Sequence, residues 1–351
     1  MTLNITVLSE RLSATQVISF VLPCSQISNS YCSVNLIDYQ QQKRSIQHAG
    51  SASFLDNLNM DFLILSRFTL KLAETSVNHC KSHNLPVAFH IDDLLVDVPP
   101  EIGSDKYDRY TSVSYRSELM HILNSVDIII SSTPRLTECL AKYGFSNIRT
   151  MPLYRCSLED YPDHSCFDNL SPIIGYMGTR SHQVDLETIV PSIKQMMLET
   201  PSLQFQTFGC QVPYELSILF PDRVKSLSGV NNYNDFLSKL SSLGWWIGLA
   251  PLLRSRFNSC KAPTKWVEYT EAGIPCIAEN FGPYSCYQDS NCIALCDTQS
   301  DWYLSMRMLL ENRFMRESVV RSAKEIQTQR MPPMELIDFY ANIYKEFKKN
   351  V

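Results

Sequence analysis

Residues 245–284 read WWIGLAPLLRSRFNSCKAPTKWVEYTEAGIPCIAENFGPY, and they hold two apolar runs on either side of one amphipathic segment. The runs Trp245–Ala250 and Cys276–Ala278 are short and continuous, as strands buried on both faces of a parallel sheet are. Between them, Lys261–Ala272 has helical spacing, and Gly273-Ile274-Pro275 ends the segment. The stretch therefore predicts a strand–helix–strand unit of a parallel α/β domain.

The same alternation runs through the rest of the second half. Apolar runs and helical segments follow one another: predicted strands 173–177 and 203–208, predicted helices 186–198 and 234–242, and closing helices 303–310, 316–327 and 335–348. Repeated strand–helix units of this kind indicate a doubly wound sheet. The second half is thus expected to form an α/β domain of its own.

The first half shows a separate alternation. Its predicted strands are 17–23, 61–66, 86–91, 126–130 and 147–151, and its predicted helices are 71–81, 112–124 and 134–143. Residues 156–171, between the halves, are poor in aliphatic side chains and carry several Asp and Pro residues, so they are predicted as a linker. A chain of 351 residues is also too long for one typical core. We therefore predict domains over 1–155 and 172–330, followed by a final segment, 331–351.

The bulk composition excludes several classes of protein. The net charge is −5, so nucleic acid is not the expected partner. No apolar run is long enough to span a bilayer, and the start MTLNITVLSE lacks the pattern of a signal peptide. The twelve cysteines include no CxxC pair, so no metal ligand is predicted. We expect a globular, cytoplasmic, reduced protein.

Charged residues that directly follow strands are the candidate site residues, because ligands of open parallel sheets bind beyond the carboxyl ends of the strands. Lys261, Lys265 and Glu268 follow strand 245–250 and would share one helix face. Two cations near a helix N-terminus suit a diphosphate, and a carboxylate one turn further suits the hydroxyls of a ribose. The alternative is a solvated helix whose lysines pair with nearby carboxylates.

A second connection, at the start of the second half, contains glycine and a cation. Gly178 would let a phosphate approach the backbone, and Arg180, two residues after it beyond Thr179, could clamp that phosphate. The alternative is an ordinary strand-to-helix turn with Asp185 as the helix N-cap. In a third connection, Tyr233 either supports a nucleobase or packs in the core.

Asp92 and Asp93 follow predicted strand 86–91 in the first half. They lie where that sheet would open into a cleft, and either could orient or deprotonate an acceptor hydroxyl. Two alternatives stand beside this one. The DDxxxD pattern with Asp97 could bind magnesium next to a diphosphate, or Asp92 could cap a turn. The sequence does not distinguish the two aspartates.

With these residues in place, the chain resembles glycosyltransferases of the GT-B fold, in particular bacterial surface-polysaccharide enzymes of glycosyltransferase family 4. The resemblance is most specific over 174–185 and 251–284. It implies two Rossmann-like domains that face a cleft, with the nucleotide sugar on 172–330 and the acceptor on 1–155. It also implies that the helix within 331–351 crosses back to the N-terminal domain.

The family pattern places two glutamates eight positions apart, the second followed by Gly-x-Pro, and Glu268 matches the second, which implies a ribose contact. The first position falls on Cys260, which departs from the pattern at the place that addresses the donor sugar. Asn258 and Lys261 would compensate, since N-x-x-K-x-x-x-K-x-x-E resembles the arrangement in a subset of surface-polysaccharide enzymes. The family's basic pair for the diphosphate resembles Lys261 or Lys265 combined with Arg180 or Arg254.

The resemblance implies a hexosyl- or deoxyhexosyltransferase that moves a sugar from a nucleoside-diphosphate donor to a glycan or lipid-linked glycan in O-antigen or capsule assembly. It implies retention of configuration without a metal, with no tightly bound cofactor, so that fixed cations stabilise the departing diphosphate. In an inverting reaction Asp92 or Asp93 would be the base. A GT-B binding module without transferase activity is the other alternative. The basic end Tyr344–Lys349 suits peripheral contact with the inner face of a membrane or is a solvated helix end.

Overall fold

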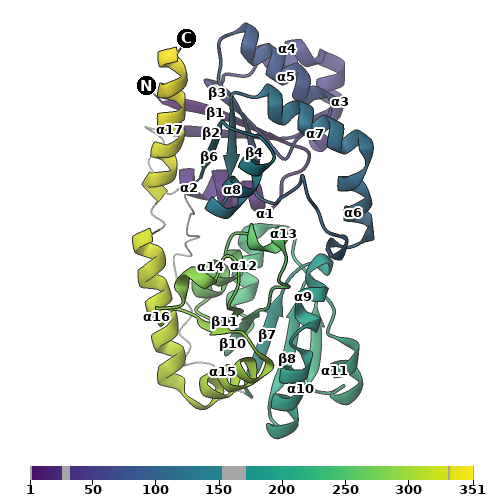
Figure 1. Cartoon of the computed structure of the whole chain (residues 1–351), viewed down its shortest axis with the longest axis vertical. Helices are drawn as coiled ribbons and strands as arrows, with labels where there is room; N and C mark the ends of the chain where they lie inside the picture. The colour runs from purple at the N-terminus through teal and green to yellow at the C-terminus, as the bar shows by residue number, and fades with distance from the viewer. Residues whose placement is uncertain (1, 26–31, 152–170, 331–332, 351) are drawn as a thin grey trace.

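The computed structural model describes residues 2–25, 32–151, 171–330 and 333–350. Figure 1 shows two α/β domains stacked along the long axis of the molecule, each built around one parallel sheet. The predicted linker, 156–171, lies outside the described residues except for Ser171. The two α/β domains are confirmed, while their boundaries stay predictions.

The N-terminal sheet has six parallel strands in the order β2-β1-β3-β4-β5-β6. Their bounds are β1 Leu3–Ser9, β2 Cys32–Asp38, β3 Phe62–Ser66, β4 Val87–Ile91, β5 Ile128–Ser131 and β6 Ile148–Thr150. The last four are the strands predicted over 61–66, 86–91, 126–130 and 147–151. The sequence pattern does not predict β1 and β2, because β1 mixes Asn4 and Thr6 into its apolar run and β2 is an edge strand with exposed Ser33 and Asn35.

The prediction of a strand over 17–23 is wrong. That segment is part of one helical stretch: α1 (Ala14–Gln16), the π-helical turn η1 (Val17–Val21) and α2 (Leu22–Ser25). Ser13 and Gln16 form a capping box that starts the helix, and the Ser13 backbone N–H donates to Gln16 Oε1 at 2.9 Å. Phe20 is fully buried on one side of it. The start signal and one buried face outweigh the β-branched composition.

Helices cover both faces of the N-terminal sheet. They are α3 Tyr39–Ala49, α4 Ser51–Asp56, α5 Lys71–Ser82, the 3-10 turn η2 Pro100–Ile102, α6 Ser104–Thr111, α7 Val113–Ser125 and α8 Pro134–Lys142. The helices predicted over 71–81, 112–124 and 134–143 are confirmed as α5, α7 and α8. Thr133 caps α8, and its Oγ1 accepts a hydrogen bond from the Leu136 N–H at 3.1 Å.

The C-terminal sheet also has six parallel strands, in the order β9-β8-β7-β10-β11-β12. Their bounds are β7 Ile173–Met177, β8 Gln204–Phe208, β9 Val224–Leu227, β10 Ile247–Ala250, β11 Cys276–Glu279 and β12 Ala294–Cys296. The strand order reverses between β7 and β10, since the chain first builds outward from β7 through β8 and β9. The carboxyl ends of β7 and β10 are therefore where a ligand is expected to bind.

The helices of the C-terminal domain differ from prediction in two places. They are η4 Arg180–His182, α9 Gln183–Glu187, α10 Val190–Glu199, α11 Tyr214–Leu219, α12 Tyr233–Ser241, α13 Arg256–Ser259, α14 Thr264–Glu271, η5 Ser285–Tyr287, α15 Gln299–Glu311 and α16 Arg313–Arg330. The helix predicted over 186–198 is split, with Pro191 in the first turn of α10. The helix predicted from Lys261 begins at Thr264, because Pro263 disfavours helical backbone at Ala262.

The last helix, α17 (Pro333–Asn350), crosses back to the N-terminal domain as predicted. Figure 1 shows α16 beside the C-terminal domain and α17 beside the N-terminal one. Leu336, Ile337, Tyr340 and Ile343 of α17 are buried in the hydrophobic cluster that contains Ile5 of β1 and Phe62 of β3. Among the described residues, none of the helices combines the length and apolarity needed to cross a bilayer.

Candidate functional site

A cavity of about 310 Å³ lies between the two domains, at the carboxyl ends of β4, β7 and β10. Residues of both domains line it, and its charged side chains include Asp92, Asp93, Lys106, Asp185, Lys261, Lys265 and Glu268. The position follows from the sheet topology, because this is where the strand order of the C-terminal sheet reverses. The strand-end rule thus brought most of its candidates to one place.

Lys261, Lys265 and Glu268 all line the cavity, although only the last two lie on one helix. Lys261 precedes α14 and lies with its Nζ 5.5 Å from the centre of the Phe257 ring. Burial lowers the pKa of Lys265, and the positive charge of Lys261 lowers it further. Two cations that destabilise each other in a half-buried cavity favour a bound anion, which would relieve both effects.

Glu268 lies one turn deeper on α14 and is 7% exposed. Burial raises its pKa to about 7, while a hydrogen bond from the Tyr233 side chain and the charge of Lys265 act in the opposite direction. Tyr233 is itself buried, at the start of α12, with its ring 5.8 Å from that of Phe236. Tyr233 therefore packs in the core and also touches the candidate ribose ligand.

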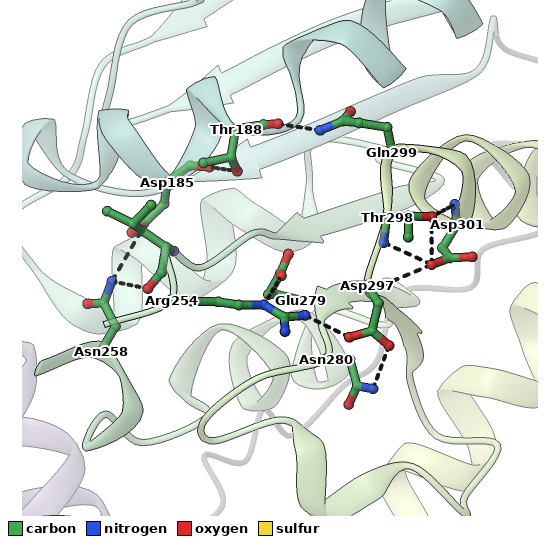
Figure 2. Close-up of polar contacts among 11 residues, drawn as sticks. Asp185, Thr188, Arg254, Asn258, Glu279, Asn280, Asp297, Thr298, Gln299 and Asp301 are labelled. Atoms are coloured by element: carbon green, nitrogen blue, oxygen red, sulfur yellow. Dashed lines mark hydrogen bonds and ion pairs between the residues drawn. The ribbon is translucent and has the colours of Figure 1, made fainter. Parts of the chain in front are cut away.

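Asp185 is a site residue that the sequence pattern assigned to another role. It is not the N-cap of a helix, because α9 begins at Gln183 and the Asp185 side chain is 4% exposed against the cavity. One carboxylate oxygen lies 3.0 Å from Nδ1 of His182, and the other accepts hydrogen bonds from the Leu253 N–H at 2.9 Å and from Asn258 Nδ2 at 3.4 Å. Figure 2 shows Asn258 directed at this carboxylate.

The charges around Asp185 fix its ionisation and that of His182. Burial alone would raise the pKa of Asp185, but the hydrogen bonds from His182 and the Leu253 N–H hold it below its usual range. The nearby charge of Lys265, together with burial, lowers the pKa of His182 to about 3. An ionised carboxylate and a neutral imidazole therefore form the floor of the cavity beside the two lysines.

The two candidate arginines lie away from this cluster. Arg254 is held on the surface by Glu279 at 2.9 Å and Asp297 at 2.6 Å, as Figure 2 shows. Arg180 is exposed in η4 and is not among the residues that line the cavity. The structure therefore does not bring either arginine next to Lys261 and Lys265.

Glycines at the ends of β7, β8 and β9 form a bare backbone ledge near the cavity. Gly209 has φ +87°, and a Cβ there would lie 2.8 Å from the carbonyl oxygen of Gly178. A Cβ on Gly229 would lie 3.4 Å from Cα of Gly209. Gly178 and Thr179 thus stand at a point where a flat ligand could approach the backbone closely.

On the N-terminal side, Asp92 and Asp93 share one guanidinium that the sequence analysis missed. Arg67 Nη1 lies 3.2 Å from Asp92 Oδ1 and 3.5 Å from Asp93 Oδ2, and Nη2 donates to the Tyr110 hydroxyl at 3.1 Å. Arg67 directly follows β3 and has a φ of 51°, which is uncommon for a residue other than glycine. The strand-end rule that selected Asp92 would also have selected Arg67.

The two aspartates, which the sequence could not distinguish, have different environments. Burial would raise the pKa of Asp92, but Arg67 lowers it below the usual range, and Thr15 Oγ1 donates to Asp92 Oδ2 at 2.8 Å. The pKa of Asp93 is raised by burial and by the charge of Asp92. The magnesium pattern is not assembled, because Asp97 lies 3.4 Å from Arg256 instead.

Cys260, the position at which the family pattern is broken, does not face the cavity. Its side chain is fully buried in the hydrophobic cluster of the N-terminal domain, together with Phe257. A small apolar side chain at 260 therefore serves the contact between the domains. Asn258 and Lys261, on either side of it, do line the cavity.

Comparison with known proteins shows the fold. No protein-family model matches the chain, and no curated protein sequence matches it. HepE of Anabaena, solved with UDP-glucose, is similar in structure with a TM-score of 0.65 and 12% identity, over 98% of this chain and 99% of that one. A glycosyltransferase from Rickettsia africae gives a TM-score of 0.64 and 11% identity over 100% of both chains.

A third similar structure is MnaA of Staphylococcus aureus, solved with UDP, which has a TM-score of 0.55 and 10% identity over 100% of this chain and 98% of that one. These likenesses confirm the predicted GT-B arrangement of two Rossmann-like domains and a crossing helix. At such low identity they show the fold alone. Membership of glycosyltransferase family 4 stays a prediction.

Proposed function

We propose that this chain is a GT-B glycosyltransferase that binds a nucleoside-diphosphate sugar on its C-terminal domain, within 172–330, and an acceptor on its N-terminal domain, within 1–155. The observation that carries the proposal is the cluster of Lys261, Lys265 and Glu268 in the cavity between the domains. A cation with a lowered pKa, a second cation beside it and a buried carboxylate match a diphosphate followed by a ribose.

The diphosphate would lie at the N-terminal end of α14, between Lys261 and Lys265. Negative charge grows on a diphosphate as the bond to the sugar breaks, so fixed cations there stabilise the transition state more than the ground state. The free N–H groups at the start of α14 add to this. In this proposal Lys261 and Lys265 act on the leaving group, and the chain supplies this stabilisation from its own side chains.

The rest of the nucleotide would extend along the ends of β7 to β9. Glu268 accepts the ribose hydroxyl hydrogens, and the base rests on the backbone ledge at Gly178 and Thr179, with Tyr233 behind Glu268. The complexes of HepE with UDP-glucose and of MnaA with UDP support a uridine nucleotide as the first candidate. Asn258 keeps Asp185 in place at the sugar end, and a phosphate-clamping role for Arg180 stays a prediction.

The acceptor would enter from the side of Asp92 and Asp93. Arg67 keeps Asp92 ionised, whereas Asp93 holds a proton more readily, so the pair offers one acceptor and one adjustable group for a hydroxyl. We propose a glycan or lipid-linked glycan of bacterial surface polysaccharide as acceptor and retention of configuration, as the family resemblance implies. In an inverting enzyme Asp93 would be the better base, because its pKa is the higher of the two.

The test starts with the purified chain and a panel of nucleotide sugars, screened by thermal shift. The cognate donor raises the melting temperature with concentration, because it binds the native state. With that donor, hydrolysis or transfer to glycan acceptors should be strongly reduced in Lys261→Ala and Glu268→Ala and retained in Lys194→Ala, a lysine paired with Glu215 far from the cavity.

Three outcomes would contradict the proposal. Full activity and unchanged donor affinity in both Lys261→Ala and Glu268→Ala would show that the donor binds elsewhere. Saturable donor binding without any turnover, over the whole acceptor panel, would favour a binding module. Conversion of the donor sugar into an epimer without transfer would favour a GT-B epimerase.

A further inference from the structure

A second cluster of ligand-type side chains lies far from the cavity. Asp56 ends α4, His79 lies on α5, and His83 follows the last residue of α5. Figure 1 shows α4 and α5 at the end of the N-terminal domain that points away from the C-terminal domain. Whatever this cluster binds is therefore separate from the proposed donor and acceptor.

The three side chains are close enough to share one ion. One ligand atom from each of Asp56, His79 and His83 lies within 4.8 Å of the other two. The histidines are four residues apart, so they project from one face of α5, and their ring centres are 4.2 Å apart. His79 Nδ1 lies 3.6 Å from Asp56 Oδ1 on the neighbouring helix.

Hydrogen bonds already orient His83 as a metal ligand. Its Nδ1 lies 2.9 Å from the backbone carbonyl oxygen of His79 and 3.0 Å from the hydroxyl of Ser82. A carbonyl only accepts, so Nδ1 carries the proton and Nε2 presents its lone pair. A ring N–H donated to a carbonyl is the arrangement that fixes the tautomer of histidines that bind metals.

His79 is prepared in a different way. Its side chain is 10% exposed, and burial together with the neighbouring His83 lowers its pKa, with Asp56 acting in the opposite direction. The neutral ring is the form that binds a metal, so no proton has to be displaced from His79 near neutral pH. Asp56, at 57% exposed, lies open to solvent and lets an ion enter without unfolding α4.

We propose that Asp56, His79 and His83 bind one divalent transition-metal ion of the zinc class. Two imidazole nitrogens and one carboxylate oxygen suit Zn²⁺, Co²⁺ or Ni²⁺, whereas Mg²⁺ and Ca²⁺ prefer sets made only of oxygen. Water completes the coordination on the solvent side. The bound ion ties the end of α4 to the end of α5 and stabilises the N-terminal domain, because the three ligands come together only in the fold.

The experiment titrates Co²⁺ and Zn²⁺ into the chelator-treated full chain, in a Cys286→Ser background that removes an exposed thiol. We expect saturable binding of one ion per chain, a higher melting temperature with Zn²⁺, and a cobalt spectrum without the thiolate charge-transfer band. His83→Ala and Asp56→Asn, two exposed positions, should each weaken binding by about tenfold or more.

The matched control is His121→Ala. His121 is an exposed histidine of α7 that lies 3.5 Å from Glu74 and has no second imidazole beside it in the cluster, so metal affinity should not change. Equal affinity in His83→Ala and the parent would overturn the site. Absence of saturable Co²⁺ binding, or a thiolate band in the cobalt spectrum, would do so too. A melting-temperature shift with Mg²⁺ as large as with Zn²⁺ would overturn the proposed metal class.

Discussion

The hydroxyl of Thr133, in the N-terminal domain, donates a hydrogen bond to the backbone carbonyl of Cys260, in the C-terminal domain, at 2.7 Å and fully buried. The same hydroxyl accepts from the Leu136 N–H at the start of α8. One side chain therefore caps a helix of one domain and anchors the backbone of the other.

The contact extends over the whole of α13, which Figure 1 places at the boundary between the domains. Phe257 and Cys260 are buried in the N-terminal core, and Arg256 reaches Asp97 at 3.4 Å. Lys261 is the next residue after Cys260. The backbone position of this donor-site cation is thus set by the N-terminal domain as much as by its own.

We expect Thr133→Val to lower transferase turnover without removing any cavity residue. The variant loses the bond to Cys260 and the cap of α8, which should cost roughly 1–2 kcal/mol of unfolding free energy. A displaced Lys261 stabilises the leaving diphosphate less well, so kcat should fall by about tenfold or more while KM changes little. Steady-state kinetics and chemical denaturation measure the two effects.

The control for this prediction is Thr75→Val. Thr75 is an exposed threonine whose hydroxyl bonds only within its own helix, at 3.4 Å to the Lys71 carbonyl. It should leave turnover unchanged. If Thr133→Val lost stability but kept the parent kcat, the link between the domain contact and Lys261 would be refuted.

Lys265→Met should separate activity from stability. Burial and the charge of Lys261 lower the pKa of Lys265, so its charged form destabilises the unliganded fold at neutral pH. An apolar side chain of similar length should raise the unfolding free energy of the ligand-free protein. At the same time kcat/KM should fall by roughly 10²–10³-fold, since one fixed cation at the leaving group is lost.

Arg254→Gln is the matched comparison for Lys265→Met. Arg254 pairs with Glu279 and Asp297 on the surface, and exposed pairs of this kind contribute about 0–1 kcal/mol. Both donor affinity and turnover should stay close to the parent values. A larger loss in Arg254→Gln than in Lys265→Met would place the diphosphate on the other side of β10.

Glu268 should make both donor affinity and stability depend on pH. Its folded pKa of about 7 is raised above its ordinary value of 4.5, so the folded state keeps a proton that the unfolded state has already lost. The unfolding free energy should therefore fall as pH rises from about 4.5 to about 7. Donor affinity should rise over the upper part of that range, because the ionised carboxylate is the form that accepts the ribose hydroxyls.

Glu268→Gln removes this titration. Chemical denaturation at pH 5 and pH 8 should show a smaller decrease in unfolding free energy in the variant than in the parent. Calorimetric titration with the nucleotide should lose its rise in affinity near pH 7. An identical pH profile in Glu268→Gln would show that another group causes the effect.

The sequence was sufficient for the parts of the fold and site that depend on local order. Buried parallel strands appear as continuous apolar runs, so β7, β8 and β10 were predicted, and the residues that follow them fell in the cavity. The capping box at Ser13 and Gln16 was a local signal too, and it was overridden by the weight given to β-branched residues. Pro263 was a similar signal, which would have moved the start of α14.

The parts that could not be predicted depend on contacts between distant segments. Nothing near Cys260 in the sequence indicates Thr133, and nothing near Asp185 indicates the Leu253 N–H that holds its carboxylate. The spacing of His79 and His83 is visible in the sequence, but Asp56 joins them only through the packing of α4 on α5. Such contacts give a residue type its role, and they are absent from local patterns.

Arg67 provides the last prediction, because it holds Asp92 and Asp93 together at the acceptor side. Arg67→Gln removes the positive charge that lowers the pKa of Asp92, so that pKa should rise toward and beyond its ordinary value. If an ionised Asp92 orients the acceptor, the acidic limb of the rate profile should move to higher pH, and KM for the acceptor should rise more than KM for the donor. Asp92→Asn should abolish the acidic limb altogether. An unchanged acidic limb in Arg67→Gln would remove Asp92 from the acceptor site and leave Arg67 with a purely structural role.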